Sequence, residues 1–159
     1  MKKLILAVTL MLPGWAGAVE ALYLGGQFGY GAYTASSSGA LGFGGEIAVR
    51  TNPVLDLAFR SQFATHGGVG VWANTIAADL LVGQFNDFEV FIGGGPGIYS
   101  FGGNARFGLR GDLYSDLVVS DTLRLGLGWH FHGIFSPAVG ESSFWTVMAR
   151  IGFSFGMGQ

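Results

Sequence analysis

Residue types that can hydrolyse an ester gather late in the sequence. His130 and His132 precede Ser136, and Glu141 follows. A serine becomes a nucleophile when a histidine within hydrogen-bonding reach takes its proton and a third group orients that histidine. These four residues are therefore candidates for acyl hydrolysis. The two histidines are two positions apart, so in a strand they share one face, and the chemistry open to them depends on where that face points.

Two other patterns offer weaker chemistry. The run GGGPG at 93–97 looks like a phosphate-binding loop but has no following Lys-Ser/Thr, so we interpret it as small residues within a strand, with Pro96 marking a bulge. His66 precedes two glycines and is interpreted as a loop residue. The chain has no cysteine, which excludes disulfides, thiolate nucleophiles and cysteine-ligated metals. We expect no metal site and no cofactor.

The segment RFGLRGDLYSDL, residues 106–117, shows which element must position such side chains. Its charged residues all occupy even positions, and its phenylalanine and leucines all occupy odd positions. This alternation is typical of a strand whose successive side chains point to opposite faces. The segment is therefore predicted to be a strand with one charged face and one apolar face.

Similar segments fill the chain after residue 20, separated by clusters rich in Gly, Ser, Asn, Asp or Pro. They predict an all-β protein with an even number of strands. The predicted strands are 21–33, 40–50, 54–65, 71–83, 88–99, 106–119, 122–134 and 144–155.

The large apolar residues define one face of each predicted strand, and the charges fall on the other. Glu20, Asp87, Asp121 and Glu141 lie instead at termini or turns. The charges opposite the apolar face are Glu46, Arg50, Asp56, Arg60, Asp79, Glu89, Arg106, Arg110, Asp112, Asp116, Arg124 and Arg150. Six positive and six negative groups thus share one side of the sheet.

Composition decides which side meets water. The chain is 50% hydrophobic and 11% charged, whereas a soluble domain carries roughly 25% charged residues. If the apolar face meets lipid, the lack of charge on it is required, because Arg or Lys at the bilayer midplane costs about 2–4 kcal/mol. We therefore predict an eight-stranded antiparallel up-and-down transmembrane β-barrel with the charges inside. Aromatics expected to face lipid are Trp72, Phe88, Trp129, Trp145, Phe153 and Phe155.

The first 18 residues differ from the rest. Two lysines precede an apolar run that ends in Ala16-Gly17-Ala18, which is typical of a secretory signal peptide cleaved after Ala18. The predicted organisation is a signal peptide at 1–18 and a barrel at 19–159. Cleavage would leave six arginines and ten acids, a net charge of −4 with neutral histidines, which disfavours nucleic-acid binding.

The pattern resembles the small eight-stranded outer-membrane barrels of Gram-negative bacteria, the class that includes the OmpA membrane domain and OmpX. The final strand WTVMARIGFSF ends in aromatic Phe155, like the signal that the barrel assembly machinery recognises, although four residues follow it. The resemblance implies an outer-membrane location, both termini in the periplasm, and turns after strands two, four and six that are the shorter ones, with outer loops of about five to nine residues. It also implies contact with lipids including lipopolysaccharide, biogenesis through periplasmic chaperones and that machinery, and a monomer.

Eight strands enclose a lumen that side chains can fill, so we expect a plugged, charged interior and a structural or envelope-integrity role without catalysis. Two alternatives stay open. A lipid A hydrolase similar to PagL would use His130, His132, Ser136 and Glu141, but the His-x-Ser-Asn motif of that family is missing and both histidines should face the lumen. A narrow channel for small solutes is the other.

Overall fold

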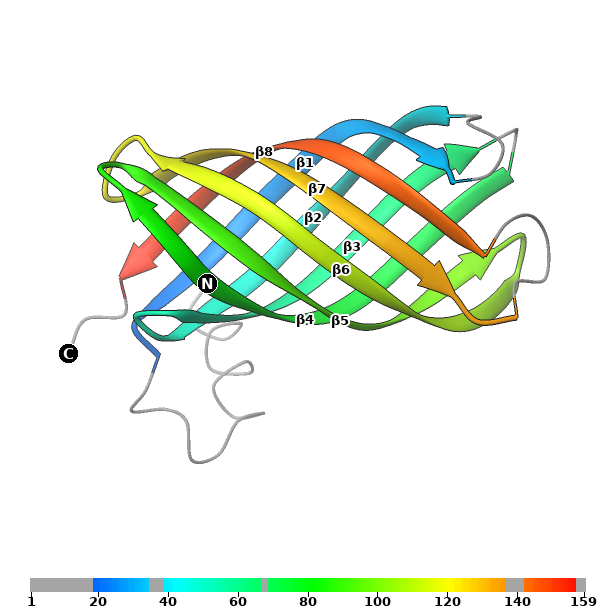
Figure 1. The fold of residues 1–159 in the computed structure, drawn as a ribbon, viewed down its shortest axis with the longest axis horizontal. Helices are drawn as coiled ribbons and strands as arrows, with labels where there is room; N and C mark the ends of the chain where they lie inside the picture. Colours follow the sequence, from blue (N-terminus) through cyan, green and yellow to red (C-terminus); the bar gives the residue numbers. More distant parts are fainter. Residues whose placement is uncertain (1–18, 35–38, 67–68, 137–141, 157–159) are drawn as a thin grey trace.

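A computed structural model describes residues 19–34, 39–66, 69–136 and 142–156. It is one closed barrel of antiparallel strands, each paired with its neighbours in sequence, and the last strand pairs with the first (Figure 1). The strands are β1 (Ala21–Tyr33), β2 (Gly39–Asn52), β3 (Leu55–His66), β4 (Val69–Phe85), β5 (Phe88–Phe101), β6 (Asn104–Val118), β7 (Leu123–Ile134) and β8 (Ser143–Gly156). The predicted fold class is confirmed.

Most of the described residues belong to these strands. Within the described ranges, no helix is long and apolar enough to span a membrane. The predicted signal peptide, 1–18, lies outside the described residues.

The barrel has two distinct ends. The terminal end carries the start of β1, the end of β8 and the connections at 53–54, 86–87 and 119–122. The loop end carries the connections that follow β1, β3, β5 and β7.

Two of the four connections at the loop end are shorter than the expected five to nine residues. β5 and β6 meet across Gly102 and Gly103 alone, and two residues separate the end of β3 from the start of β4. The connections after β1 and β7 have five and eight residues, 34–38 and 135–142, as expected. Gly102 and Gly103 have positive φ, +50° and +90°, as a two-residue hairpin turn requires. Strand pairing therefore continues from Phe101 to Asn104, into a stretch that the composition had marked as a six-residue loop. The four-residue connection at 119–122 lies at the other end.

The register of the strand pairs requires the strands to tilt relative to the barrel axis. Starting at Leu22 and moving from partner to partner around the barrel, the path returns to β1 at Ala32, a shift of ten residues (22 to 32). The intermediate partners are Val49, Leu57, Ala78, Gly94, Gly111, Phe131 and Trp145. With usual strand spacings this shift corresponds to a tilt of about 40° from the barrel axis. The tilt places residues of very different sequence position at one height in the lumen.

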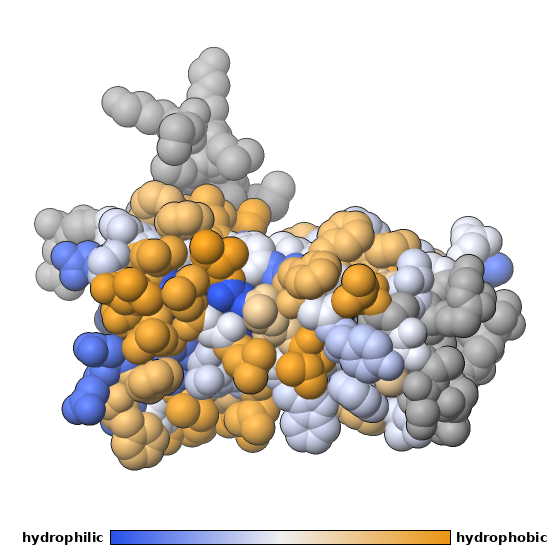
Figure 2. All heavy atoms as spheres, turned by 90° about the horizontal axis from the view of Figure 1, so that it is seen from above, coloured by the Kyte–Doolittle hydropathy of each residue, from blue (hydrophilic) through white to orange (hydrophobic). Residues whose placement is uncertain are grey.

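The outer face is apolar along the wall of the barrel (Figure 2). Leu109, in the middle of the alternating β6 segment, is 50% exposed, and its neighbours Arg110 and Gly108 are buried. The predicted lipid-facing aromatics all lie on this outer face: Trp72, Phe88, Trp129, Trp145, Phe153 and Phe155. A belt of this kind, exposed on a closed barrel, is the surface that hydrocarbon can cover.

Candidate functional site in the barrel lumen

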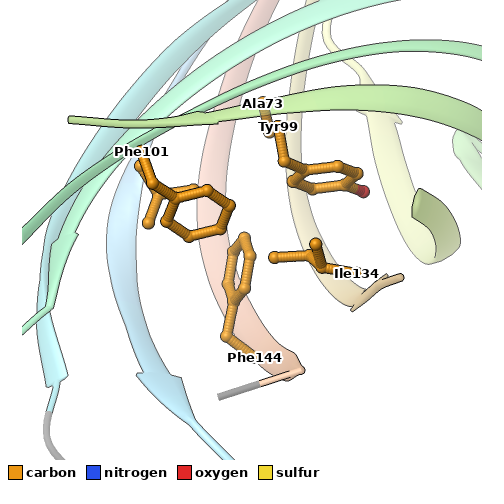
Figure 3. Close-up of a cluster of buried hydrophobic side chains, with 6 residues drawn as sticks. Ala73, Tyr99, Phe101, Ile134 and Phe144 are labelled. Carbon is orange, nitrogen blue, oxygen red and sulfur yellow. The ribbon is translucent and has the colours of Figure 1, made fainter. Parts of the chain in front are cut away.

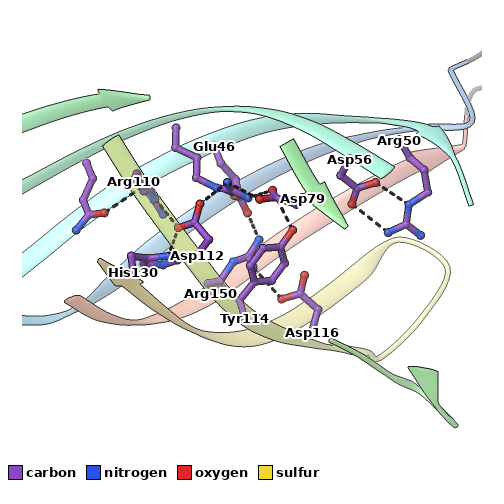
Figure 4. A network of polar contacts seen from close by, with 12 residues as sticks. Glu46, Arg50, Asp56, Asp79, Arg110, Asp112, Tyr114, Asp116, His130 and Arg150 are labelled. Atoms are coloured by element: carbon purple, nitrogen blue, oxygen red, sulfur yellow. Dashed lines mark hydrogen bonds and ion pairs between the residues drawn. The ribbon is translucent and has the colours of Figure 1, made fainter. Parts of the chain in front are cut away.

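Arg60 of β3 is the centre of the lumen. Its Nε donates to Glu46 Oε2 at 2.8 Å, and its Nη1 donates to Asp112 Oδ2 at 3.1 Å (Figure 4). Its Nη2 also pairs with Asp79. The residue is only 1% exposed. One guanidinium therefore ties β3 to β2, β4 and β6 across the interior.

Asp112 of β6 extends this centre toward the loop end. Its Oδ1 accepts a hydrogen bond from Arg110 Nε at 2.5 Å and lies 2.6 Å from His130 Nδ1. Arg60 occupies the other carboxylate oxygen. All four side chains are buried, so the pairing replaces hydration that they lose inside the barrel.

Arg150 of β8 extends the centre toward the terminal end. Its Nη2 donates to Glu46 Oε1 at 2.5 Å, and its Nη1 lies 3.5 Å from Asp116 Oδ1. The guanidinium also sits 3.8 Å from the centroid of the Tyr114 ring, a cation–π distance. The Tyr114 hydroxyl donates to Asp79 at 3.2 Å, which links this branch back to Arg60.

A second cluster of charges fills the terminal end. Arg50 makes two hydrogen bonds to Asp56, from Nε at 2.8 Å and from Nη2 at 3.1 Å. Glu89 pairs with both Arg50 and Arg124. The Tyr23 ring lies near both guanidiniums, 5.2 Å from Arg50 and 4.8 Å from Arg124.

Among the described residues, Arg106 is the one predicted lumen arginine that does not meet a carboxylate. It is on the inward side of β6 but near the start of that strand, at the loop end. Its Nε donates to the carbonyl oxygen of Ser136 at 2.9 Å, and its Nη1 donates to the carbonyl oxygen of Ala105 at 3.0 Å. The carboxylates of the network lie deeper in the barrel, out of its reach.

The loop end of the lumen contains an apolar cluster that our reading of the sequence missed. Val71 pairs with Phe101 across β4 and β5, and Phe144 of β8 packs edge-on against Tyr99 at 6.2 Å (Figure 3). The full cluster is Val71, Ala73, Tyr99, Phe101, Ile134 and Phe144. The alternation places these residues, except Phe101, at inward positions of the predicted strands, whereas Phe101 lies in the stretch predicted to be a loop.

Glycine leaves room for the network where a side chain would collide with it. A Cβ at Gly93 would lie 2.1 Å from Asp79 Oδ1, and a Cβ at Gly126 would lie 2.0 Å from Asp116 Oδ1. Real Cβ atoms do not approach so closely. The inward glycines therefore make room for the carboxylates that hold Arg60 and Arg150.

Solved structures with the same architecture are outer-membrane barrels. Neisserial surface protein A matches with a TM-score of 0.70 at 11% identity, covering 85% of this chain and 96% of that one. OprG from Pseudomonas aeruginosa matches with a TM-score of 0.68 at 12% identity, covering 87% and 97%. The N-terminal barrel domain of OprF from the same organism matches with a TM-score of 0.67 at 14% identity, covering 86% and 98%. The chain has the fold of the small eight-stranded outer-membrane barrels.

The resemblance found in the sequence is thus confirmed at the level of the fold. No protein-family model matches the chain, and no curated protein matches it.

The structure describes three of the four candidate catalytic residues, His130, His132 and Ser136. His130 bonds to Asp112, and His132 Nδ1 lies 3.1 Å from the Tyr99 hydroxyl, so both rings are inside the lumen. Ser136 is exposed just after β7, where its carbonyl oxygen accepts the bond from Arg106. Glu141 lies outside the described residues. Over the part of the chain that the structure describes, no group of three or more His, Cys, Asp or Glu side chains is placed to hold a metal ion.

Proposed function

We propose that the chain is a non-enzymatic outer-membrane barrel with a plugged, charged lumen and that it contributes to the integrity of the cell envelope. The observation that carries the proposal is the division of its residues between two faces. Paired charges and packed rings fill the interior, and apolar side chains cover the exterior. Such a barrel can span a membrane, and its filled interior leaves little space for a solute to pass.

Burial inside the lumen argues against the narrow channel. Arg60, Tyr99 and His130 are almost fully buried although they line the axis of the barrel. A conducting path needs lining groups that water reaches along its whole length. The packed interior supports the plug.

The placement of the histidines argues against the lipid A hydrolase. A group that cleaves a membrane lipid must reach the outer wall or the mouth of the barrel. His130 and His132 are instead buried in the lumen, against Asp112 and Tyr99, whereas Ser136 is exposed after β7. The geometry supports a structural use of both rings, which cross-link β7 to β6 and β5.

The proposal includes partners and orientation. The mature chain, after removal of 1–18, has both termini in the periplasm and is a monomer bounded by lipopolysaccharide and phospholipid. Periplasmic chaperones and the barrel assembly machinery insert it, and Phe155, exposed near the end of β8, is the residue through which the machinery recognises it. It has no nucleic-acid partner and no cofactor.

Cell fractionation with gel electrophoresis tests this proposal first. The protein should sediment with outer membranes and migrate differently before and after boiling, because a closed barrel resists detergent until it is heated. Cells without the protein should admit detergents and large antibiotics more readily, with unchanged lipid A mass spectra. Recovery in the soluble periplasm, altered lipid A or discrete conductance steps in planar bilayers would each refute a part of the proposal.

The role of Phe155 has its own test. Phe155→Ala should reduce the amount of barrel assembled in cells and leave refolding of the purified chain into detergent unchanged, because only the first process needs recognition. The matched control is Phe153→Ala on the same face of the same strand. Equal assembly of both variants would remove Phe155 from the proposed signal.

A further inference from the structure

The two ends of the lumen are lined by different side chains. At the terminal end, a cavity of about 30 Å³ lies among charged and aromatic side chains. Its lining includes Tyr23, Glu46, Ala48, Arg124 and Arg150. This volume is about that of one water molecule in the liquid, and it is enough to hold one or two.

Two of the residues that line this cavity carry a buried donor without a partner. Arg124 Nε and Arg150 Nε are buried and have no hydrogen-bond partner among the described residues. A buried donor left unsatisfied costs about 1–3 kcal/mol, more when it is charged. An acceptor inside the cavity would remove that penalty.

The charge balance selects the acceptor. Every arginine of this end has a carboxylate partner: Arg50 pairs with Asp56, Arg124 with Glu89 and Arg150 with Glu46. An anion would meet these carboxylates as well as the arginines. Water, a neutral acceptor of the right size, fits both. The Arg50 and Arg124 side chains are 11% and 14% exposed, so bulk solvent reaches this end.

The loop end has the opposite character. Val71, Phe101, Ile134 and Phe144 are nearly inaccessible and offer water no polar side-chain group, and the Tyr99 hydroxyl is already bonded. Water confined among such side chains loses hydrogen bonds, which is how apolar constrictions exclude it. The apolar cluster lies about 20 Å from the cavity, because Phe144 and Gly152 are eight positions apart on the inclined strand β8.

We propose that the lumen is a blind vestibule. Water enters from the terminal end, binds in the cavity and bonds to Arg124 Nε and Arg150 Nε, and the apolar cluster seals the lumen at the loop end. The charge network then exchanges water and protons with one side of the membrane only. This proposal rests on the plugged lumen proposed above and adds which end is closed and by what.

Two alanines with inward side chains allow a test without other perturbation. Ala48 lines the cavity, and Ala73 belongs to the apolar cluster. In NMR spectra of the folded parent barrel, the Ala48 methyl should show cross-relaxation with water and the Ala73 methyl should show none. Equal signals at both methyls, or a signal at Ala73 alone, would overturn the proposal.

Thiol chemistry gives a second measurement, because the chain has no cysteine of its own. Ala48→Cys and Ala73→Cys barrels would be exposed to Ag⁺, a thiol reagent small enough for the cavity, and free thiols counted after unfolding. Ala48→Cys should react at least tenfold faster. Similar rates would contradict one-sided access.

The seal itself is tested in the Ala73→Cys barrel. Adding Phe101→Ala and Phe144→Ala should speed the reaction with Ag⁺, because water then enters from the loop end. The matched control removes two phenylalanines of the outer face, Phe107→Ala and Phe131→Ala, and should leave the rate unchanged. An unchanged rate in the first variant, with the heat-modifiable mobility of a folded barrel, would refute the seal.

The failure of this inference can be told from the failure of the plugged lumen. Discrete conductance steps from the parent barrel in planar bilayers would refute the plug itself. A silent parent barrel whose Ala48→Cys and Ala73→Cys variants react alike would leave the plug standing and refute only the vestibule.

Discussion

Replacing Arg60 with methionine should destabilise the barrel more than replacing any other arginine. Its guanidinium makes four hydrogen bonds to three carboxylates, those of Glu46, Asp79 and Asp112. Methionine keeps a similar length and packing but offers no donor.

The expected loss of unfolding free energy depends on which partners each carboxylate retains in the Arg60→Met variant. Glu46 retains Arg150, and Asp112 retains Arg110 and His130. Asp79 retains only the Tyr114 hydroxyl and becomes a fully buried carboxylate without a cation. Removing one partner from a buried pair costs about 3–5 kcal/mol, and we expect the free energy of unfolding of Arg60→Met to fall by that amount.

Urea unfolding of the barrel in lipid vesicles, followed by tryptophan fluorescence, measures this change. The matched control is Arg106→Met, which removes the same charge from a side chain that, within the described residues, bonds to two backbone carbonyl oxygens at the loop end. Its expected cost is below about 1 kcal/mol.

The free energy of unfolding could fall equally in the two variants, or by less than about 1 kcal/mol in Arg60→Met. Either result would refute the claim that the buried carboxylates depend on Arg60. A double variant sharpens the test. Adding Asp79→Asn removes the stranded charge, so the combined loss should be smaller than the sum of the single losses by about 1–3 kcal/mol.

Two further predictions concern the two faces of the wall. Gly126→Ala places a Cβ 2.0 Å from Asp116 Oδ1 and should lower the free energy of unfolding by about 1–3 kcal/mol, whereas Gly111→Ala, with nothing within 4 Å, should change it by less than about 0.5 kcal/mol. Comparable losses in the same urea titration would contradict the close approach. Leu109→Arg, in the middle of the outer face of β6, should cost about 2–4 kcal/mol in vesicles, and Phe88→Arg, at the terminal end, about 0–1. A larger loss for Phe88→Arg would contradict the position of the membrane along the barrel.

Much of the fold followed from the amino-acid sequence because its signal is local. Alternation within β6 assigns Leu109 and Arg110 to opposite faces without knowledge of any other strand, and the same holds for Leu125 beside Arg124. The composition of the whole chain then predicts which face is outside. The ends of strands were less predictable. The glycines at 102–103 appeared to belong to a longer loop, because composition does not reveal that two positive φ angles let the pairing continue.

Which charges meet was decided by tertiary structure alone. Arg60 and Asp112 are 52 positions apart, and they touch because closure with a shift of ten residues brings β3 and β6 to one height in the lumen (22 to 32 along β1). The same geometry leaves Arg106 above the carboxylates and gathers Phe101 and Phe144 into a cluster at the loop end. Alternation fixes the direction of a side chain but not its height, because height depends on register and strand tilt, which exist only once the barrel has closed.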